Sequence, residues 1–492
     1  MNQSEKFQLR NWELVSINPN NRDWSWKNYF NFWAINIQTI IGFSLISAFY
    51  LFYDLNFFVV LIGSLLAGLL VFFFANIIGK ISQSSGLSFP TILRLSMGFT
   101  GARYVGMIRG LVGLFMFGVQ TFFISKSLGY IARIIIFKID NQLLQNEIFL
   151  LFFFGLNLID WACLFLTLIF QYILFTKGQN FLKSFINFSG LSIYLGLSVL
   201  LIVILSEYYN ELLNGIKLSL VFSNFAIQSN IAPIISITGT LFAYFAIVLL
   251  TFGDFSRYSM NYKEMTKGNL SIILNLIFFS FFSVLITLGS DIILTSKGLN
   301  ASSLLTNPND IVGKFNNNFL TFFCLIFIII SSLSTNLIAN YIPSQNTLIN
   351  FFPNSLTLKK TGIVISIIGL IISTFWLSIF SKANVLIFVE AVATTFGPIF
   401  GVLVADYYLF KKQQINHKEL FYPKEHTEYI YSNGWNFKAL YALLIGSIFS
   451  LSSLLNENLI QYQSFGWIIG AFASYLVYYL SLIHISEPTR RH

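Results

Sequence analysis

The chain has 492 residues, of which 55% are apolar, 18% are aromatic and only 10% are charged. Soluble globular proteins carry about 25% charged residues, because their surface faces water. With its two cysteines and little polarity, the chain is neither a soluble enzyme, nor disordered, nor disulfide-rich; an integral membrane protein remains.

Long uninterrupted apolar runs indicate spanning helices rather than the short alternating segments of a β-barrel. Each spanning helix needs roughly 20 apolar residues. The tail 484–492 changes composition abruptly and is left outside the fold prediction. The remaining chain predicts an all-α membrane protein with twelve transmembrane helices, at residues 28–53, 55–80, 103–137, 147–176, 182–206, 232–253, 269–295, 317–342, 361–381, 383–410, 438–455 and 461–483.

The basic residues are unevenly distributed between the two ends of these spans. With the N-terminus inside, 22 Lys and Arg fall on the cytoplasmic side and 6 on the other, while Lys126 lies within the third span. Because cytoplasmic loops are enriched in Lys and Arg, we expect both termini to be cytoplasmic in the cell (plasma or inner) membrane. Residues 1–27 and 411–437 are then cytoplasmic segments. The net charge of +9 is a topology signal, not a nucleic-acid-binding surface.

Polar residues interrupt several spans in mid-membrane, where transporters place their binding sites. Spans 1 and 6 occupy corresponding positions if helices 1–5 and 6–10 are inverted repeats. The polar positions are Asn36, Gln38 and Thr39 in the first span, Gln120 in the third, and Thr238, Gly239, Thr240 and 251–254 in the sixth.

The eighth span is the most polar. Six polar residues fall within the ten positions 331–340, and Asn336 and Asn340 share one helix face, as do Ser331 and Thr335. A single Ser or Thr usually bonds to a carbonyl of its own helix. Two amides in addition predict a cavity or mutual pairing, because an unsatisfied amide in lipid costs several kcal/mol.

Five stretches in matching order resemble the nucleobase:cation symporter-1 family, which includes cytosine, uracil, allantoin and thiamine permeases and the sodium–hydantoin symporter. They are Arg22–Gln38, Gly86–Gln120, Asp254–Tyr258 (DFSRY), Ser334–Asn340 and Gly397–Phe410, with Gly434-Trp435-Asn436 beyond. The resemblance implies a monomer with the five-plus-five inverted repeat of neurotransmitter:sodium symporters. The repeats are then 28–206 and 232–410, followed by two C-terminal helices at 438–483.

The resemblance also implies a substrate site. Gln120 matches the family's substrate-amide position, and Asn340 matches a substrate hydrogen-bonding position. Met116 stands where the family usually has a stacking Trp, and Phe245 where it has a second one. Phe245 retains a flat aromatic face but Met116 does not, so we expect a smaller, less aromatic or differently seated ligand than a 5-substituted hydantoin.

Ser334 and Thr335 match the family's sodium-ligating hydroxyls, and the other sodium ligands are backbone carbonyls of the first span. Two registers fit there: Ala34 and Ile37 with Gln38 facing substrate, or Ile35 and Gln38 with Thr39. We prefer the first because it places an amide beside the ligand. Thr39 stays a substrate-site candidate.

Carboxylates and bends supply candidates for coupling and gating. Glu390 lies mid-span, where it could sense the gate or pair with Lys126, and Gly397-Pro398 supplies a bend in the same span. Asp254 and Asp406 lie at span ends beside Arg257 and Lys411, where capping or salt bridging is expected. All four histidines lie outside the spans.

No set of His, paired carboxylates or metal ligands indicates an enzyme. The predicted function is secondary active import of a nucleobase or related small heterocycle by alternating access, with sodium as coupling ion and no other cofactor. The expected partners are this substrate and the bilayer, not nucleic acid. A proton-coupled nucleobase permease and an amino-acid or polyamine carrier of the same fold stay open as alternatives.

Overall fold

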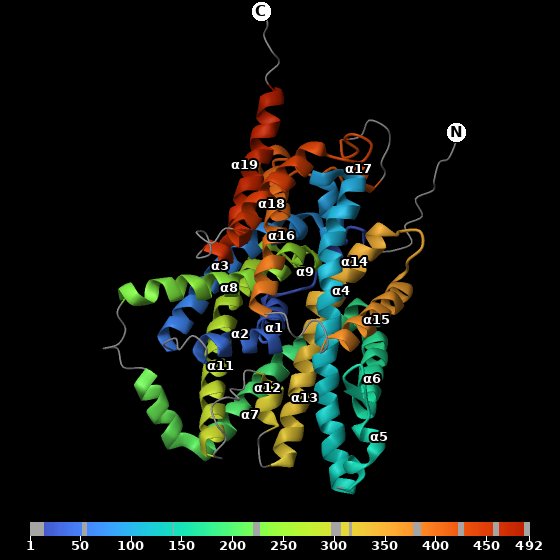
Figure 1. Ribbon diagram of the computed structural model, residues 1–492. Coiled ribbons are helices and arrows are strands. Elements are labelled where there is room, and N and C mark those ends of the chain that lie inside the picture. Colours follow the sequence, from blue (N-terminus) through green and yellow to red (C-terminus); the bar gives the residue numbers. More distant parts are fainter. Residues whose placement is uncertain are drawn as a thin grey trace, which may run out of the picture.

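The structure of the chain is a computed structural model, shown in Figure 1. Helices make up almost all of the described part, whose only strands, β1 (Phe152–Phe153) and β2 (Leu156–Asn157), pair antiparallel. The predicted all-helical class is therefore confirmed. The described residues are 14–51, 57–140, 142–219, 227–296, 307–313, 317–376, 385–421, 428–455 and 462–486.

Among these residues, nine helices are long and apolar enough to cross a membrane, and a bent pair near the N-terminus makes a tenth. Two shorter apolar helices, Phe396–Phe410 and Phe437–Ser452, overlap predicted spans 10 and 11, so the count of twelve is met only in part. The helices are η2 (Pro19–Asn21), α1 (Trp26–Ile37), α2 (Ile40–Leu51), α3 (Phe57–Ser85), α4 (Phe89–Ile139), η3 (Leu143–Gln145), α5 (Glu147–Leu150), α6 (Leu158–Phe175), α7 (Gln179–Ser219), α8 (Ile227–Thr251), α9 (Gly253–Ser256), α10 (Tyr262–Asn269), α11 (Ser271–Ser296), α12 (Pro308–Val312), α13 (Asn318–Thr335), η6 (Asn336–Tyr341), α14 (Ile342–Phe351), α15 (Leu358–Phe375), α16 (Val385–Ala405), η8 (Asp406–Phe410), α17 (His417–Phe421), α18 (Phe437–Leu455) and α19 (Gly466–Ser486).

The first predicted span is broken. Its two halves, α1 and α2, are bent by 59°. Gln38 and Thr39 lie between them, and the Thr39 hydroxyl accepts a 2.8 Å hydrogen bond from the N–H of Gly42. This bond caps the first turn of α2. The predicted interruption of the first span is therefore confirmed.

Two other expectations for the spans are wrong. Residues 147–157 do not start the fourth span, because positive φ angles at Phe154 and Gly155 turn the chain into a short hairpin and Asn157 then caps α6. The sixth span is not interrupted at Thr238, whose hydroxyl donates to Ile234 O within a continuous α8. That span ends instead near Thr251.

The eighth span changes helix type at its polar stretch. α13 ends at Thr335, and residues Asn336–Tyr341 form the π-helix η6 before α14 begins. A π-turn widens the helix and is frequent at functional sites. Asn336 and Asn340 both lie in this wide turn.

The long helix α4 runs almost the full height of the molecule in Figure 1, with α13, α14, α15 and α6 beside it. It is kinked at Gly98, whose φ of 78° and ψ of 174° are not helical. Helices α16, α18 and α19 pack against one another, and α16 also packs against α8 and α4.

Exposed apolar side chains mark the outer surface of the bundle. Leu65, Leu69 and Phe73 of α3 are spaced four residues apart and are 36%, 44% and 58% exposed. This spacing places them on one helix face. A large exposed apolar face on a membrane helix contacts lipid.

Candidate functional site

Hydroxyl groups of α13 lie against the break between α1 and α2. Thr335 Oγ1 donates to Ile35 O at 2.9 Å, and Ser331 Oγ donates to Gln38 O at 2.9 Å. Thr335 Oγ1 and Ser334 Oγ also lie 3.0 and 2.8 Å from Ser331 O. Several neutral oxygens therefore converge between the broken helix and α13.

The same contacts bear on the register of the first span. The carbonyls of Ala34 and Ile37 accept local hydrogen bonds from the N–H groups of Gln38 and Thr39, each at 2.9 Å. The carbonyls of Ile35 and Gln38 are the ones that face the α13 hydroxyls. The geometry favours the second register over the one that we preferred from the sequence.

Gln38 and Thr39 point to different neighbours. Gln38 Nε2 donates to Asn275 Oδ1 of α11 at 3.2 Å, while Thr39 Oγ1 lies 2.7 Å from the hydroxyl of Tyr244 in α8. Gln38, Thr39 and Ser331 also line a cavity of about 60 Å³ bounded by α2, α7, α11 and α13. Gln38 thus faces α11, and Thr39 is the one directed at the helix that carries Phe245.

Gln120 and Met116 lie one turn apart on α4, and both are buried. Gln120 Nε2 has no hydrogen-bond partner among the described residues. Met116 and Phe245 are both buried, and the Phe245 ring meets Tyr244 edge-on at 5.0 Å. An unpaired buried amide N–H group and a buried aromatic ring are groups that a planar heterocycle can use.

Asn340 joins this region through the π-helix. Its Nδ2 donates to Asn336 Oδ1 at 2.9 Å, and Asn336 Nδ2 in turn donates to Phe117 O and Thr121 Oγ1 of α4, both at 3.2 Å. These bonds attach η6 to the segment of α4 that carries Met116 and Gln120. The structure therefore brings Asn340 beside α4.

Arg109 is buried in the same part of the molecule, with 0% of its surface exposed. Its Nε donates to Ile247 O of α8 at 3.2 Å and its Nη2 to Ala339 O of η6 at 2.7 Å. The guanidinium also lies 5.9 Å from the centre of the Phe396 ring in α16. Arg109 thus ties α4 to three other elements.

The DFSRY stretch joins α9 to the start of α4. Asp254 Oδ1 accepts a 3.0 Å hydrogen bond from the N–H of Phe89, at the first turn of α4. The predicted capping role of Asp254 is therefore confirmed. Burial raises the pKa of Asp254 to about 6, although Arg257 opposes this shift.

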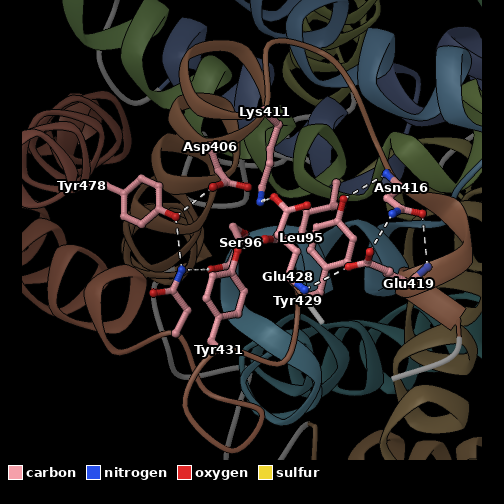
Figure 2. Close-up of polar contacts among 11 residues, drawn as sticks. Leu95, Ser96, Asp406, Lys411, Asn416, Glu419, Glu428, Tyr429, Tyr431 and Tyr478 are labelled. Carbon is pink, nitrogen blue, oxygen red and sulfur yellow. Dashed lines mark hydrogen bonds and ion pairs between the residues drawn. The ribbon is translucent and has the colours of Figure 1, made fainter. Parts of the chain in front are cut away.

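A second polar network joins the end of α16 to α19 and α4 (Figure 2). Asp406 Oδ1 accepts from the hydroxyl of Tyr478 at 2.8 Å, and Asn436 donates to both Tyr478 and Ser96 O. Lys411 pairs with Glu428. Of the two roles expected for Asp406, capping or salt bridging, the salt bridge with Lys411 is wrong, because Lys411 pairs with Glu428 and Tyr478 donates to the carboxylate.

The gate and coupling candidates have partly different neighbours from those expected. Lys126 pairs with Asp310 of α12 at 3.2 Å. Glu390 belongs to α16, and its side chain lies outside the described residues. Gly397 lies against the carbonyl of Trp467, and the carbonyl of Pro398 accepts from Ser474 at 2.9 Å, so both pack α16 onto α19.

Comparison with known proteins identifies this arrangement. Residues 16–479 match the family described as permease for cytosine/purines, uracil, thiamine and allantoin. The chain belongs to this permease family. The permease is 24% identical over 502 residues to the allantoin permease of Bacillus subtilis (strain 168), covering 99% of this chain and 95% of that relative.

Solved structures agree on the fold of the permease. MHP1, a nucleobase-cation-symport-1 family transporter in a closed conformation with bromovinylhydantoin bound, superposes with a TM-score of 0.73 at 15% identity, over 97% of this chain and 96% of that one. A Na⁺-coupled sialic acid symporter in a substrate-bound outward-open state gives 0.63 at 12% identity, over 95% and 91%. The resemblance seen in the sequence is confirmed: this is a multi-pass membrane transporter with the MHP1 fold.

Sequence reasoning missed one residue near the site of the permease. Arg109 was counted among the charges of the cytoplasmic face, yet it is fully buried. A signal was available, because Arg109 lies seven residues before Met116 and therefore on the same face of α4. An ionisable residue within a span is a functional candidate.

Proposed function

We propose that the permease imports a nucleobase or related small heterocycle, of the uracil, cytosine, allantoin, hydantoin or thiamine type, by sodium symport. The observation that carries the proposal is the convergence of the α13 hydroxyls on the broken first span. Thr335 and Ser331 contact the carbonyls of Ile35 and Gln38 at 2.9 Å each. A helix break that presents its carbonyls to hydroxyls is a usual way of binding Na⁺ within a membrane.

The proposed cation site uses uncharged oxygens. Its ligands are the hydroxyls of Ser334 and Thr335 and the carbonyls of Ile35, Gln38 and Ser331. When sodium enters, the Thr335 hydroxyl turns its hydrogen away from Ile35 O, so that its oxygen lone pairs and this carbonyl both face the ion. The ion thereby fixes α1 and α2 against α13.

The proposed substrate site lies between α4, α8 and η6. Gln120 supplies a free amide that pairs with the N–H and C=O groups of the heterocycle, and Asn340 supplies a second amide after release from Asn336. Phe245 stacks on the ring while Met116 packs on the other face. Thr39 closes the site beside the helix break.

Alternating access follows from this layout. In the proposed cycle, the two five-helix repeats and two C-terminal helices form a monomer whose termini are both cytoplasmic. Sodium and substrate share the α1–α2 break, so binding of each tightens the other by the same factor. Rotation of the helices around this fixed region then exposes the site to the cytoplasm.

Uptake into proteoliposomes tests the proposal. We expect radiolabelled uracil, cytosine, allantoin, a hydantoin or thiamine to accumulate only with an inward sodium gradient. Uptake that persists unchanged in choline and follows a proton gradient contradicts sodium coupling. Uptake of amino acids or polyamines, with none of the heterocycles, contradicts the substrate class.

A further inference from the structure

The guanidinium of Arg109 is a buried positive charge that carbonyl groups orient but do not neutralise. Its two hydrogen bonds go to Ile247 O and Ala339 O, both uncharged. Among the described residues no carboxylate forms a salt bridge with it. Nη1 is buried and has no hydrogen-bond partner in the same part of the chain. A buried cation with an unused donor calls for an acceptor.

The two carbonyls place Arg109 under the proposed substrate site. Ala339 directly precedes Asn340, and Ile247 lies two residues after Phe245. Met116 lies seven residues further along α4, which is about 10 Å at 1.5 Å per residue. Arg109 therefore lies about two helical turns from Met116, at the end of the site nearer the start of α4.

Glycine at position 113 allows other groups to pack closely beside the free donor. A Cβ added at Gly113 would lie 3.0 Å from Arg109 Nη1 and 3.0 Å from Asn340 O, and it would also overlap the hydroxyl of Ser344. Glycine at this position lets Arg109 Nη1, the backbone of Asn340 and the hydroxyl of Ser344 approach one another closely. Nη1 thus faces the segment that carries a substrate-site residue.

We infer that Arg109 is a specificity-determining residue that makes the permease select uncharged or acidic oxo-heterocycles and reject cationic ones. The inference rests on the proposed function and narrows its substrate class. Nη1 donates to a carbonyl or carboxylate oxygen on the edge of the ligand that faces the start of α4. Thiamine-like and polyamine-like cations are excluded, because the site already holds a positive charge that no ion pair cancels.

Opposite charge near Arg109 is limited. Asp254 is the carboxylate that acts on the guanidinium, at a distance beyond an ion pair. Arg257 lies beside the same carboxylate, and Asp254 Oδ1 already accepts the N–H of Phe89. The electrostatic potential that Arg109 produces at a ligand bound between α4 and η6 therefore stays positive.

Competition experiments in proteoliposomes test this inference. The inhibitors are three uracils of similar size that carry aminomethyl, hydroxymethyl or carboxyl at position 5, so that only the charge differs. Wild-type uptake should be inhibited at least about tenfold more weakly by the aminomethyl compound than by the hydroxymethyl compound. The Arg109→Met variant keeps much of the side-chain volume without the charge. In this variant, the aminomethyl and hydroxymethyl compounds should inhibit uptake with strengths that agree within about threefold.

Arg109→Lys keeps the charge but loses the planar fork, so all three inhibitors should weaken while the preference against the cation stays. The matched control is Arg133→Met, at the other end of α4, where the arginine pairs with Asp160 at 2.7 Å. This control should keep the wild-type preference.

Either of two results overturns the inference. One is a preference against the aminomethyl compound that is unchanged in Arg109→Met. The other is a wild type that accepts the aminomethyl compound or thiamine as readily as the neutral compound. The second result is measured on the wild type and therefore does not depend on whether any variant folds. Absence of any heterocycle uptake by the wild type counts instead against the proposed function.

Discussion

The hydroxyl of Thr335 in α13 donates a 2.9 Å hydrogen bond to the carbonyl of Ile35 at the end of α1, 300 residues earlier in the chain. The same hydroxyl lies 3.0 Å from Ser331 O in its own helix. Thr335 is thus shared between its own helix and the broken span. In the proposed cation site, this relationship connects an uncharged ligand to the α1–α2 break.

We expect Thr335→Ala to raise the sodium concentration for half-maximal uptake by at least about tenfold, because it removes one neutral oxygen ligand from the cation. Thr335→Ser keeps the oxygen and should remain close to the wild type. The measurement is substrate uptake by proteoliposomes at increasing external sodium.

The control for this variant is Thr167→Ala, since among the described residues the Thr167 hydroxyl bonds only to Cys163 O within α6. It should leave the sodium dependence unchanged. Equal sodium dependence in Thr335→Ala and Thr167→Ala would show that the proposed cation site is wrong.

A second prediction concerns the free amide of Gln120. Its Nε2 is buried without a partner among the described residues, which costs about 1–3 kcal/mol. Gln120→Met keeps the side-chain length and removes this unsatisfied donor. We expect the melting temperature of the detergent-solubilised protein to rise while substrate uptake falls at least about tenfold.

Asn340→Leu provides the contrast, because Asn340 donates to Asn336 at 2.9 Å. Loss of that bond leaves a buried acceptor unpaired, so both the melting temperature and uptake should fall. A Gln120→Met variant that is less stable than the wild type, with uptake intact, contradicts the role of Gln120.

Features that depend on local sequence could be predicted. The break of the first span follows from Gln38 and Thr39 in an apolar helix, and the polar stretch 331–340 has a helix change at its centre. Both are positions where side chains compete with the helix for hydrogen bonds. The membrane class follows from composition alone.

Features that depend on helix rotation and partner choice could not be predicted. The carbonyls of Ile37 and Gln38 are one residue apart and so differ by a rotation of roughly 100° about the helix axis. Because the alignment is ambiguous by one residue, it leaves open which of the two carbonyls faces α13. Arg109 resembles a cytoplasmic-face charge in sequence, since only three-dimensional packing shows that carbonyls of α8 and η6 bury it. Lys126 and Asp310 meet only through the position of α12.

A third prediction concerns pH. Asp254 lies in α9, outside the membrane-crossing helices, and burial raises its pKa from 3.8 to about 6. Between these values the folded protein keeps a proton that the unfolded chain releases. The resulting stability is fully present below pH 3.8 and is lost as the pH rises through about 6.

Asp254→Asn removes this titration and keeps an oxygen that accepts the N–H of Phe89. We expect the variant to gain stability relative to the wild type as the pH rises from about 4 to about 7, measured by thermal unfolding in detergent. A difference that stays constant over this range contradicts the raised pKa. Asp23→Asn, at a half-exposed carboxylate paired with Lys183, controls for general charge effects.

A final prediction concerns the kink in α4. Gly98 has a φ of 78°, and a Cβ added there would lie 2.6 Å from the carbonyl of Gly434. That carbonyl accepts the N–H groups of Thr100 and Gly101, at 2.8 and 3.1 Å, so it cannot move away without losing both bonds. The kink is thus held by the segment that also carries Asn436, which donates to Ser96 O and to Tyr478.

Gly98→Ala should therefore destabilise the permease by about 1–3 kcal/mol from backbone strain, and by more from the overlap with Gly434. The matched control is Gly106→Ala on the same helix, where a Cβ would meet only Leu93 and Thr347 side-chain carbons at 3.3 and 3.9 Å. Thermal unfolding in detergent should show a large loss for the first variant and little change for the second. Equal losses of stability in the two variants would contradict this prediction. They would show that alanine at the kink costs no more than alanine at an ordinary helical position, and that the kink at Gly98 does not tie α4 to residue 434.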